Sequence, residues 1–155
     1  MNLRNKIISA KKAFRLAATA RKKGLKVVFT NGCFDVLHAG HVKTLSKARS
    51  FGDILILGLN SDSSVRRLKG HGRPINCFSD RAAVLAALCC VDYVVGFKED
   101  TPYLLIKGIK PDVLVKGGDY RPETVVGAEF SGQVRIIPLL KGRSTTKIIE
   151  KKSHK

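Results

Sequence analysis

The stretch KVVFTNGCFDVLHAGH, from Lys26 to His41, decides how the rest of the chain is organised. It begins with an apolar, β-branched run at 27–30 that is long enough for a buried strand, and Asn31-Gly32 then ends that strand. After the second histidine the apolar residues recur at helical spacing, at Val42, Leu45 and Ala48. The stretch therefore predicts a buried strand, a short loop and the first turn of a helix.

His38 and His41 stand at the start of this helix, three residues apart, so both side chains face the same way on its first turn. Gly40 between them leaves the backbone open to a close ligand. A helix N-terminus offers unpaired N–H groups and a partial positive charge, and it therefore attracts phosphate. A lone histidine is more often structural. The paired spacing in this context instead indicates a site that holds a phosphate while its charge rearranges.

Apolar runs and helical patterns alternate along the remaining chain, which is typical of a doubly wound α/β fold. Further strands are expected at 54–59, 93–96, 113–116 and 134–138. Their runs are apolar on both faces, as in a parallel sheet that helices cover on each side. We therefore expect one domain with a Rossmann-like, five-stranded parallel sheet. An N-terminal helical segment, 1–25, precedes its main part, 26–155.

The helices and loops of this fold are placed by their start and stop signals. A helix is expected at 7–23, and the polar, basic segment 60–76 reads as a partly ordered loop above the carboxyl ends of the strands. Ser79 is the expected N-cap of the next helix, and Thr101-Pro102 is expected to start another with proline in its first turn. The last helix follows Ser144–Thr146.

Two other clusters begin where a strand ends or a helix starts. Lys116 with Gly117 and Gly118 can place a point charge and an open backbone beside a phosphate, although a solvated turn is an equal reading of this pattern alone. The hydroxyls at 144–146 can grip a phosphate or merely cap a helix. Arg81, near the head of its helix, would usually be solvated if it stood alone.

Taken together, these motifs resemble a known family. A HxGH motif after a strand that ends in GxFD is similar to the nucleotidyltransferase superfamily with a Rossmann-like core. Over residues 6–151 the chain resembles the heptose branch of this superfamily, the D-glycero-β-D-manno-heptose 1-phosphate adenylyltransferases. The segments that carry the resemblance are NGCFDVLHAGH (31–41), NSD (60–62), RLKGHGRPIN (67–76), DRAAVLAAL (80–88), DVLVKGGDY (112–120) and GRSTTKIIEK (142–151). Such enzymes occur alone or as the carboxyl-terminal part of a bifunctional kinase–transferase. The chain has no room for the sugar kinase, so the stand-alone form is expected.

The resemblance implies a reaction in which ATP and the heptose 1-phosphate give ADP-heptose and pyrophosphate for lipopolysaccharide core synthesis. It implies three catalytic residues, His38, His41 and Lys116. The implied ATP-binding residues are Asn31, Gly32, Cys33, Phe34, Gly40, His41, Arg81, Lys116, Gly118, Ser144, Thr145 and Thr146. The implied sugar-phosphate residues are Asp35, Asn60, Asp62, Lys69 and Arg73. Mg²⁺ is expected on the ATP phosphates without protein side chains as ligands, and a homodimer or higher oligomer is expected.

Composition bounds the alternatives. With 155 residues the chain suits one domain, and no apolar run approaches the roughly 18–20 residues that span a bilayer. No secretion signal is recognised at the N-terminus, so we expect the cytoplasm. The four cysteines lack metal-ligand spacing, and Cys33 is expected to be structural. The net charge of +17 keeps a basic nucleic-acid-binding module open, although the charge is spread along the chain.

A second alternative is another transferase of the same superfamily, which uses CTP or acts on a different phosphorylated alcohol, of the glycerol 3-phosphate or FMN type. Leu139 and Cys89 stand where related cytidylyltransferases carry arginines. Both departures argue against cytidylyl transfer to glycerol phosphate.

Overall fold

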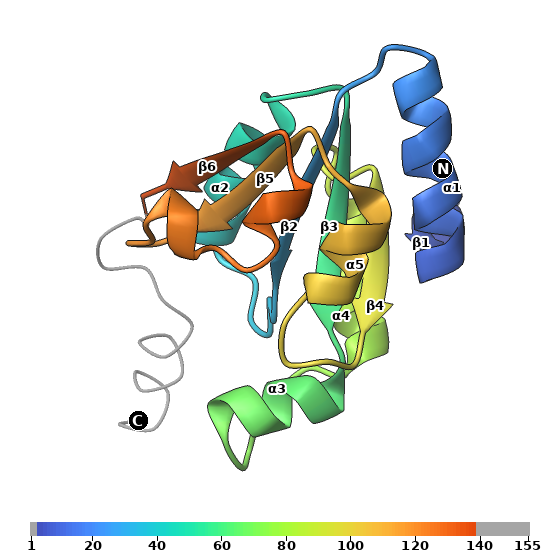
Figure 1. The fold of residues 1–155 in the computed structure, drawn as a ribbon. Coiled ribbons are helices and arrows are strands. Elements are labelled where there is room, and N and C mark those ends of the chain that lie inside the picture. The colour runs from blue at the N-terminus through green and yellow to red at the C-terminus, as the bar shows by residue number, and fades with distance from the viewer. Residues whose placement is uncertain (1–2, 139–155) are drawn as a thin grey trace.

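The structure, a computed structural model, describes residues 3–138 and contains one parallel β-sheet (Figure 1). In the described residues the sheet has six strands in the order β1-β4-β3-β2-β5-β6. Their bounds are β1 (Ile7–Ile8), β2 (Val27–Gly32), β3 (Ile54–Asn60), β4 (Tyr93–Phe97), β5 (Val113–Gly117) and β6 (Gln133–Ile137). Every neighbouring pair is parallel.

Helices cover both faces of the sheet, as the sequence predicted. The helices are α1 (Ala10–Lys22), α2 (Ala39–Arg49), α3 (Asp62–Lys69), α4 (Phe78–Ala87) and α5 (Tyr103–Ile109), with 3-10 turns η1 (Leu3–Lys6), η2 (Pro122–Thr124) and η3 (Ala128–Phe130). Successive strand residues point to opposite faces. Phe29 accordingly packs in the core shared with α1 and α5, whereas Val28 packs in the core shared with α2 and α4.

The chain reverses its direction across the sheet beside β2. From β2 it passes through α2 to β3 and then to β4, and α5 returns it to β5 on the other side of β2. In doubly wound sheets, the loops that leave two such strands diverge, and ligands bind in the crevice between them at the carboxyl ends. The seam between β2 and β5 is therefore where this fold places a site.

The prediction of five strands is wrong by one, because Ile7 and Ile8 form a sixth. They pair with Val94 and Val95 of β4 at the edge of the sheet. The helix expected at 7–23 begins only at Ala10, after Ser9, whose side chain accepts a hydrogen bond from the Lys12 N–H. A two-residue strand has no periodicity of its own, so the sequence pattern assigns Ile7 and Ile8 to the helix that follows.

The loop expected at 60–76 is also partly wrong, since it contains α3. Ser61 caps this helix by accepting a hydrogen bond from the Ser64 N–H. The N-cap of α4 is Cys77 rather than Ser79, and Pro102 is the N-cap of α5 rather than its first residue. The closing helix expected after Ser144–Thr146 lies outside the described residues. Among the helices described, none is long and apolar enough to cross a membrane.

The contact between α1 and α5 gives a test of the packing. A Cβ added at Gly108 would collide with the ring of Phe14. In a free helix alanine would be the better residue, but overpacking outweighs that gain, so we expect Gly108→Ala to lower the free energy of unfolding by about 1–2 kcal/mol. Denaturant unfolding measures the change. In a Phe14→Leu background the loss should shrink, and an equal loss in both backgrounds would contradict the assigned contact.

Candidate functional site

The two histidines are fixed at the N-terminus of α2. His38 is the N-cap, and its Nδ1 accepts a hydrogen bond of 3.1 Å from the Gly40 N–H. The rings of His38 and His41 are stacked, with centroids 3.8 Å apart and planes 23° from parallel. The structure thus confirms that both imidazoles lie together on the first turn of a helix. A phosphate placed there would meet the positive end of the helix dipole.

His41 is a neutral imidazole at physiological pH. Burial, and to a lesser degree the neighbouring His38, lowers the pKa of His41 from 6.5 to about 4. Its Nδ1 is buried and has no hydrogen-bond partner among the described residues. Buried polar atoms without partners are rare in packed cores and call for a functional explanation. A neutral imidazole keeps one N–H, so His41 can serve as a hydrogen-bond donor without carrying charge.

Lys116 reaches across the seam between β5 and β2. Its Nζ donates a hydrogen bond of 2.9 Å to Oδ1 of Asn31 and lies 5.8 Å from the centroid of the Tyr120 ring. Burial lowers the pKa of the Lys116 ammonium. A buried ammonium with a neutral amide as partner gains from an incoming anion, so this position favours a phosphate oxygen.

The loop after β2 is held in an unusual conformation. Phe34 has φ of 45°, in the left-handed region that non-glycine residues rarely adopt. Its ring lies over Gly32, where a Cβ would come within 2.8 Å of it, and meets the His41 ring edge-on with centroids 5.0 Å apart. Gly32 is thus required for the packing of the loop itself. Burial raises the pKa of the Cys33 thiol in this loop, which disfavours the reactive thiolate.

Asp35 fixes the position of the loop that contains Arg73, Ile75 and Asn76. Its Oδ1 accepts hydrogen bonds from the N–H groups of Ile75 and Asn76, and its Oδ2 pairs with Arg73. Although burial acts in the opposite direction, these hydrogen bonds and the Arg73 charge hold the pKa of the Asp35 carboxyl below its usual value. Both oxygens of Asp35 are therefore engaged within the protein.

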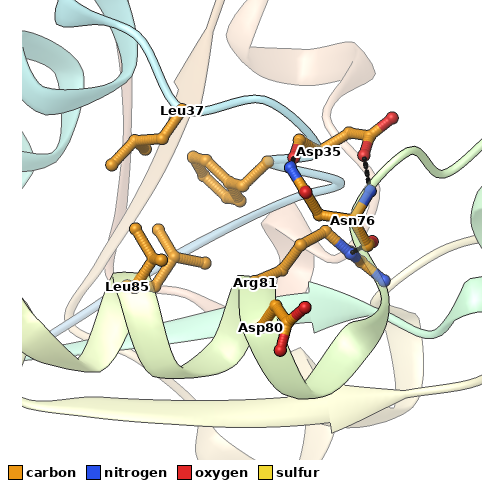
Figure 2. Close-up of a pocket in the computed structure, with 8 residues that line it drawn as sticks. Asp35, Leu37, Asn76, Asp80, Arg81 and Leu85 are labelled. Carbon is orange, nitrogen blue, oxygen red and sulfur yellow. Dashed lines mark hydrogen bonds between the residues drawn. The ribbon is translucent and has the colours of Figure 1, made fainter.

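Arg81 joins three segments around the site and is itself buried. Figure 2 shows its side chain reaching from the first turn of α4 toward Asn76. The guanidinium donates hydrogen bonds to the carbonyl oxygens of Cys33 and Asn76 and to the carboxylate of Asp62, at 2.7 Å. These bonds give Arg81 a structural role, and the ATP contact implied for it by resemblance stays a prediction.

One cavity of about 620 Å³ collects most of the predicted residues. Ten of them line it, namely Asn31, Gly32, Cys33, Phe34, Asp35, His41, Asn60, Lys69, Arg73 and Lys116. Five others are not among its lining residues: His38 and Gly40 lie at the start of α2, Gly118 follows β5, and Asp62 and Arg81 form an ion pair with each other. Ser144, Thr145 and Thr146 lie outside the described residues.

Sequence reasoning missed other residues that line the cavity, including Thr44, Leu68, Asp100, Thr101, Pro102, Tyr120, Thr124, Val125 and Val126. Asp100, Thr101 and Pro102 follow β4, whose carboxyl end was a recognisable signal for a site. Thr124 is the last residue of η2, and Val125 and Val126 follow it in an irregular segment without periodicity. Nothing in the sequence alone indicated that this segment returns to the cavity.

The side chains around the cavity suit an anionic ligand. Lys69, Arg73 and Lys116 supply positive charge, while the carboxylate of Asp35 is already bonded. Among residues 3–138, no group of three His, Cys, Asp or Glu side chains is placed to hold a metal ion. The expectation that Mg²⁺ binds to the ATP phosphates stays a prediction.

Comparisons with known proteins agree with this geometry. Residues 29–151 match the profile of the family described as cytidylyltransferase-like. The bifunctional protein HldE of Syntrophotalea carbinolica is 62% identical over 135 residues, which cover 84% of this chain and 28% of that protein. HldE of Wolinella succinogenes is 57% identical over 146 residues, which cover 94% of this chain and 31% of that protein. The chain therefore spans less than a third of the length of these curated relatives.

Solved structures are similar as well. The lipopolysaccharide core biosynthesis protein from Thermoplasma volcanium GSS1 is similar with a TM-score of 0.62 and 27% identity, covering 77% of this chain and 100% of that one. The pantoate-beta-alanine ligase from Francisella tularensis is similar with a TM-score of 0.65 and 18% identity, covering 95% of this chain and 76% of that one. The second likeness establishes the shared fold alone.

The depressed pKa of His41 predicts how stability depends on pH. Between pH 6.5 and about 4 the unfolded His41 binds a proton that the folded one does not, so the free energy of unfolding should fall as the pH falls through this window. Denaturant unfolding at several pH values measures this slope. The substitution His41→Gln should reduce this slope, whereas His71→Gln, at an exposed position, should leave it unchanged. The Asp35 carboxyl, whose pKa is lowered from 3.8, also stabilises the folded state, and this stabilisation is lost at more acidic pH than that of His41. An unchanged slope in His41→Gln would contradict the assignment.

Proposed function

This chain belongs to the cytidylyltransferase-like family, and we propose that it is an adenylyltransferase acting on D-glycero-β-D-manno-heptose 1-phosphate. The products would be ADP-heptose, for lipopolysaccharide core synthesis, and pyrophosphate. Two independent similarities support this choice within the family: the match to bifunctional HldE proteins at 56–62% identity and the likeness to a lipopolysaccharide core biosynthesis protein. The heptose-branch motifs in the sequence point to the same substrate.

The observation that carries the proposal is the meeting of His41 and Lys116 in one cavity. His41 comes from the N-terminus of α2 and Lys116 from the end of β5, and both line the space beside the seam of the sheet. An N–H donor, an ammonium and a helix N-terminus are the groups that stabilise charge developing on phosphate oxygens. No general base is needed for an acceptor that is already an ionised phosphate.

The proposed reaction would use this arrangement in one displacement. A phosphate oxygen of the sugar 1-phosphate attacks the α-phosphorus of ATP in line, the new P–O bond forms, and the bond to the β-phosphate oxygen breaks to release pyrophosphate. Positioning and charge neutralisation supply most of the catalysis in such transfers. His38 and His41 would hold α- and β-phosphate oxygens, and Lys116 would neutralise charge on them. Mg²⁺ bound with ATP would add further neutralisation of the phosphates.

The remaining contacts of the proposed complex are assigned by resemblance. The hydroxyls at 144–146, outside the described residues, would bind the triphosphate opposite the histidines. Lys69 and Arg73 would hold the sugar phosphate from the loop side, where both line the cavity. We further propose a cytoplasmic enzyme that assembles as a homodimer or a larger homo-oligomer.

Pyrophosphate release tests the reaction directly. With ATP and the heptose 1-phosphate the protein should release pyrophosphate, and replacing ATP by CTP, or the sugar phosphate by glycerol 3-phosphate or FMN, should give little. His41→Ala should lower turnover by about 10²–10³, since it removes one preorganised donor to the reacting phosphates. His71→Ala, at an exposed position, is the matched control and should keep full turnover.

Two results would count against the proposal. Near wild-type turnover in His41→Ala would remove the catalytic assignment. Absence of pyrophosphate release with every pair of substrates, together with duplex binding that weakens steeply with salt, would favour the nucleic-acid-binding alternative instead.

A further inference from the structure

The cavity extends along the carboxyl ends of four neighbouring strands. Thr101 follows β4 at one end, Asn60 and Asn31 belong to β3 and β2 in the middle, and Lys116 ends β5 at the other side. Three strand spacings separate β4 from β5, or about 14 Å. The histidines lie beside β2, so the cavity continues past them in both directions. A ligand that reacts at the histidines therefore has one part on each side.

The β5 end of the cavity carries aromatic and apolar side chains beside Lys116. Tyr120, Val125 and Val126 line it, and the Tyr120 side chain is about half exposed at 48%. A flat, exposed ring beside branched aliphatic groups suits a nucleobase, which can stack on an aromatic face.

The β4 end carries Asp100 and Thr101 on a loop that α3 holds in place. Arg67 of α3 donates hydrogen bonds to the Asp100 carboxylate at 2.8 Å and to the Lys98 carbonyl at 2.6 Å. The Ser64 hydroxyl donates to the Glu99 carbonyl at 2.9 Å, and the Ser61 N–H donates to that of Phe97 at 2.8 Å. These hydrogen bonds fix the position of a short exposed loop, and the recognition of a ligand requires side chains in defined positions.

The charge of Asp100 decides what can lie beside it. The cavity is lined by Lys69, Arg73 and Lys116, and Asp35 has both oxygens engaged. Asp100 uses only Oδ1 with Arg67, and its Oδ2 makes no hydrogen bond within residues 3–138. A carboxylate repels phosphate, so it would oppose binding if a phosphate lay against it. Neutral hydroxyl groups, in contrast, donate hydrogen bonds to a carboxylate.

Resting on the proposed function, we propose that Asp100 and Thr101 bind hydroxyl groups of the sugar ring and so select the sugar phosphate. The sugar then occupies the β4 end of the cavity, its phosphate lies between Lys69, Arg73 and the histidines, and the nucleoside lies at the β5 end against Tyr120. Arg67 acts as a positioning residue, because it fixes Asp100 without reaching the substrate.

Steady-state kinetics of Asp100→Asn and Thr101→Val test this assignment, because both changes keep the shape of the side chain. Each should raise KM for the heptose 1-phosphate by about ten- to a hundredfold, as expected for the loss of a hydrogen bond to a charged or polar partner, while KM for ATP stays within about twofold. Tyr120→Ala should do the reverse and raise KM for ATP. Glu99→Gln removes a charge from the same loop without touching the cavity and should change neither constant.

Deoxy analogues of the heptose 1-phosphate separate contact from loosening of the loop. Wild-type protein should lose kcat/KM with an analogue that lacks the contacted hydroxyl, whereas the matching variant should lose little more with that analogue. A loosened loop would instead lower kcat/KM equally for all analogues, and that result would overturn the inference. An ATP-specific defect in Asp100→Asn or Thr101→Val would also overturn it. Failure of the wild-type protein to release pyrophosphate would reject the proposed function itself.

Discussion

The hydrogen bond between Lys116 and Asn31 depends on the register of two buried parallel strands. Phe29 of β2 lies opposite Leu114 of β5, so the same register two residues later brings Asn31 and Lys116 together at the carboxyl ends. A slip of one residue would turn the lysine to the other face of the sheet and disrupt the packing of the strand's apolar residues in both cores. The hydrophobic cores on both faces thus fix the position of the ammonium.

The same burial that orients His41 also keeps it uncharged. The ring is confined between His38 and Phe34, and this confinement lowers its pKa to about 4. Positive charge for the phosphates must therefore come from Lys116, from the N-terminus of α2 and from the basic loop with Lys69 and Arg73. In the proposed complex these roles are separated, since the imidazoles would donate hydrogen bonds at defined positions and the lysines would supply the positive charge.

The sequence predicts those parts of the molecule that are governed by local pattern. The long apolar runs indicated β2 to β6, and the paired histidines indicated the N-terminus of α2. By contrast, α3 is largely polar, and its stability comes from the Ser61 cap and from tertiary bonds such as Arg67 to Asp100, which are 33 residues apart. The ion pairs of Arg81 and Asp100 could not be predicted for the same reason, because each depends on a partner that only the folded chain brings near.

Aspartate–arginine pairs surround the cavity and clarify part of the charge balance. Asp35 pairs with Arg73, Asp62 with Arg81 and Asp100 with Arg67. Each pair joins a loop or helix end to a neighbouring segment. Arg67 and Arg81 therefore act as structural partners of carboxylates, whereas Arg73 pairs with Asp35 and also lines the cavity. The lysines of the cavity remain available for phosphate. A chain with 29 basic and 12 acidic residues can thus brace its site with ion pairs and still present net positive charge to a nucleotide.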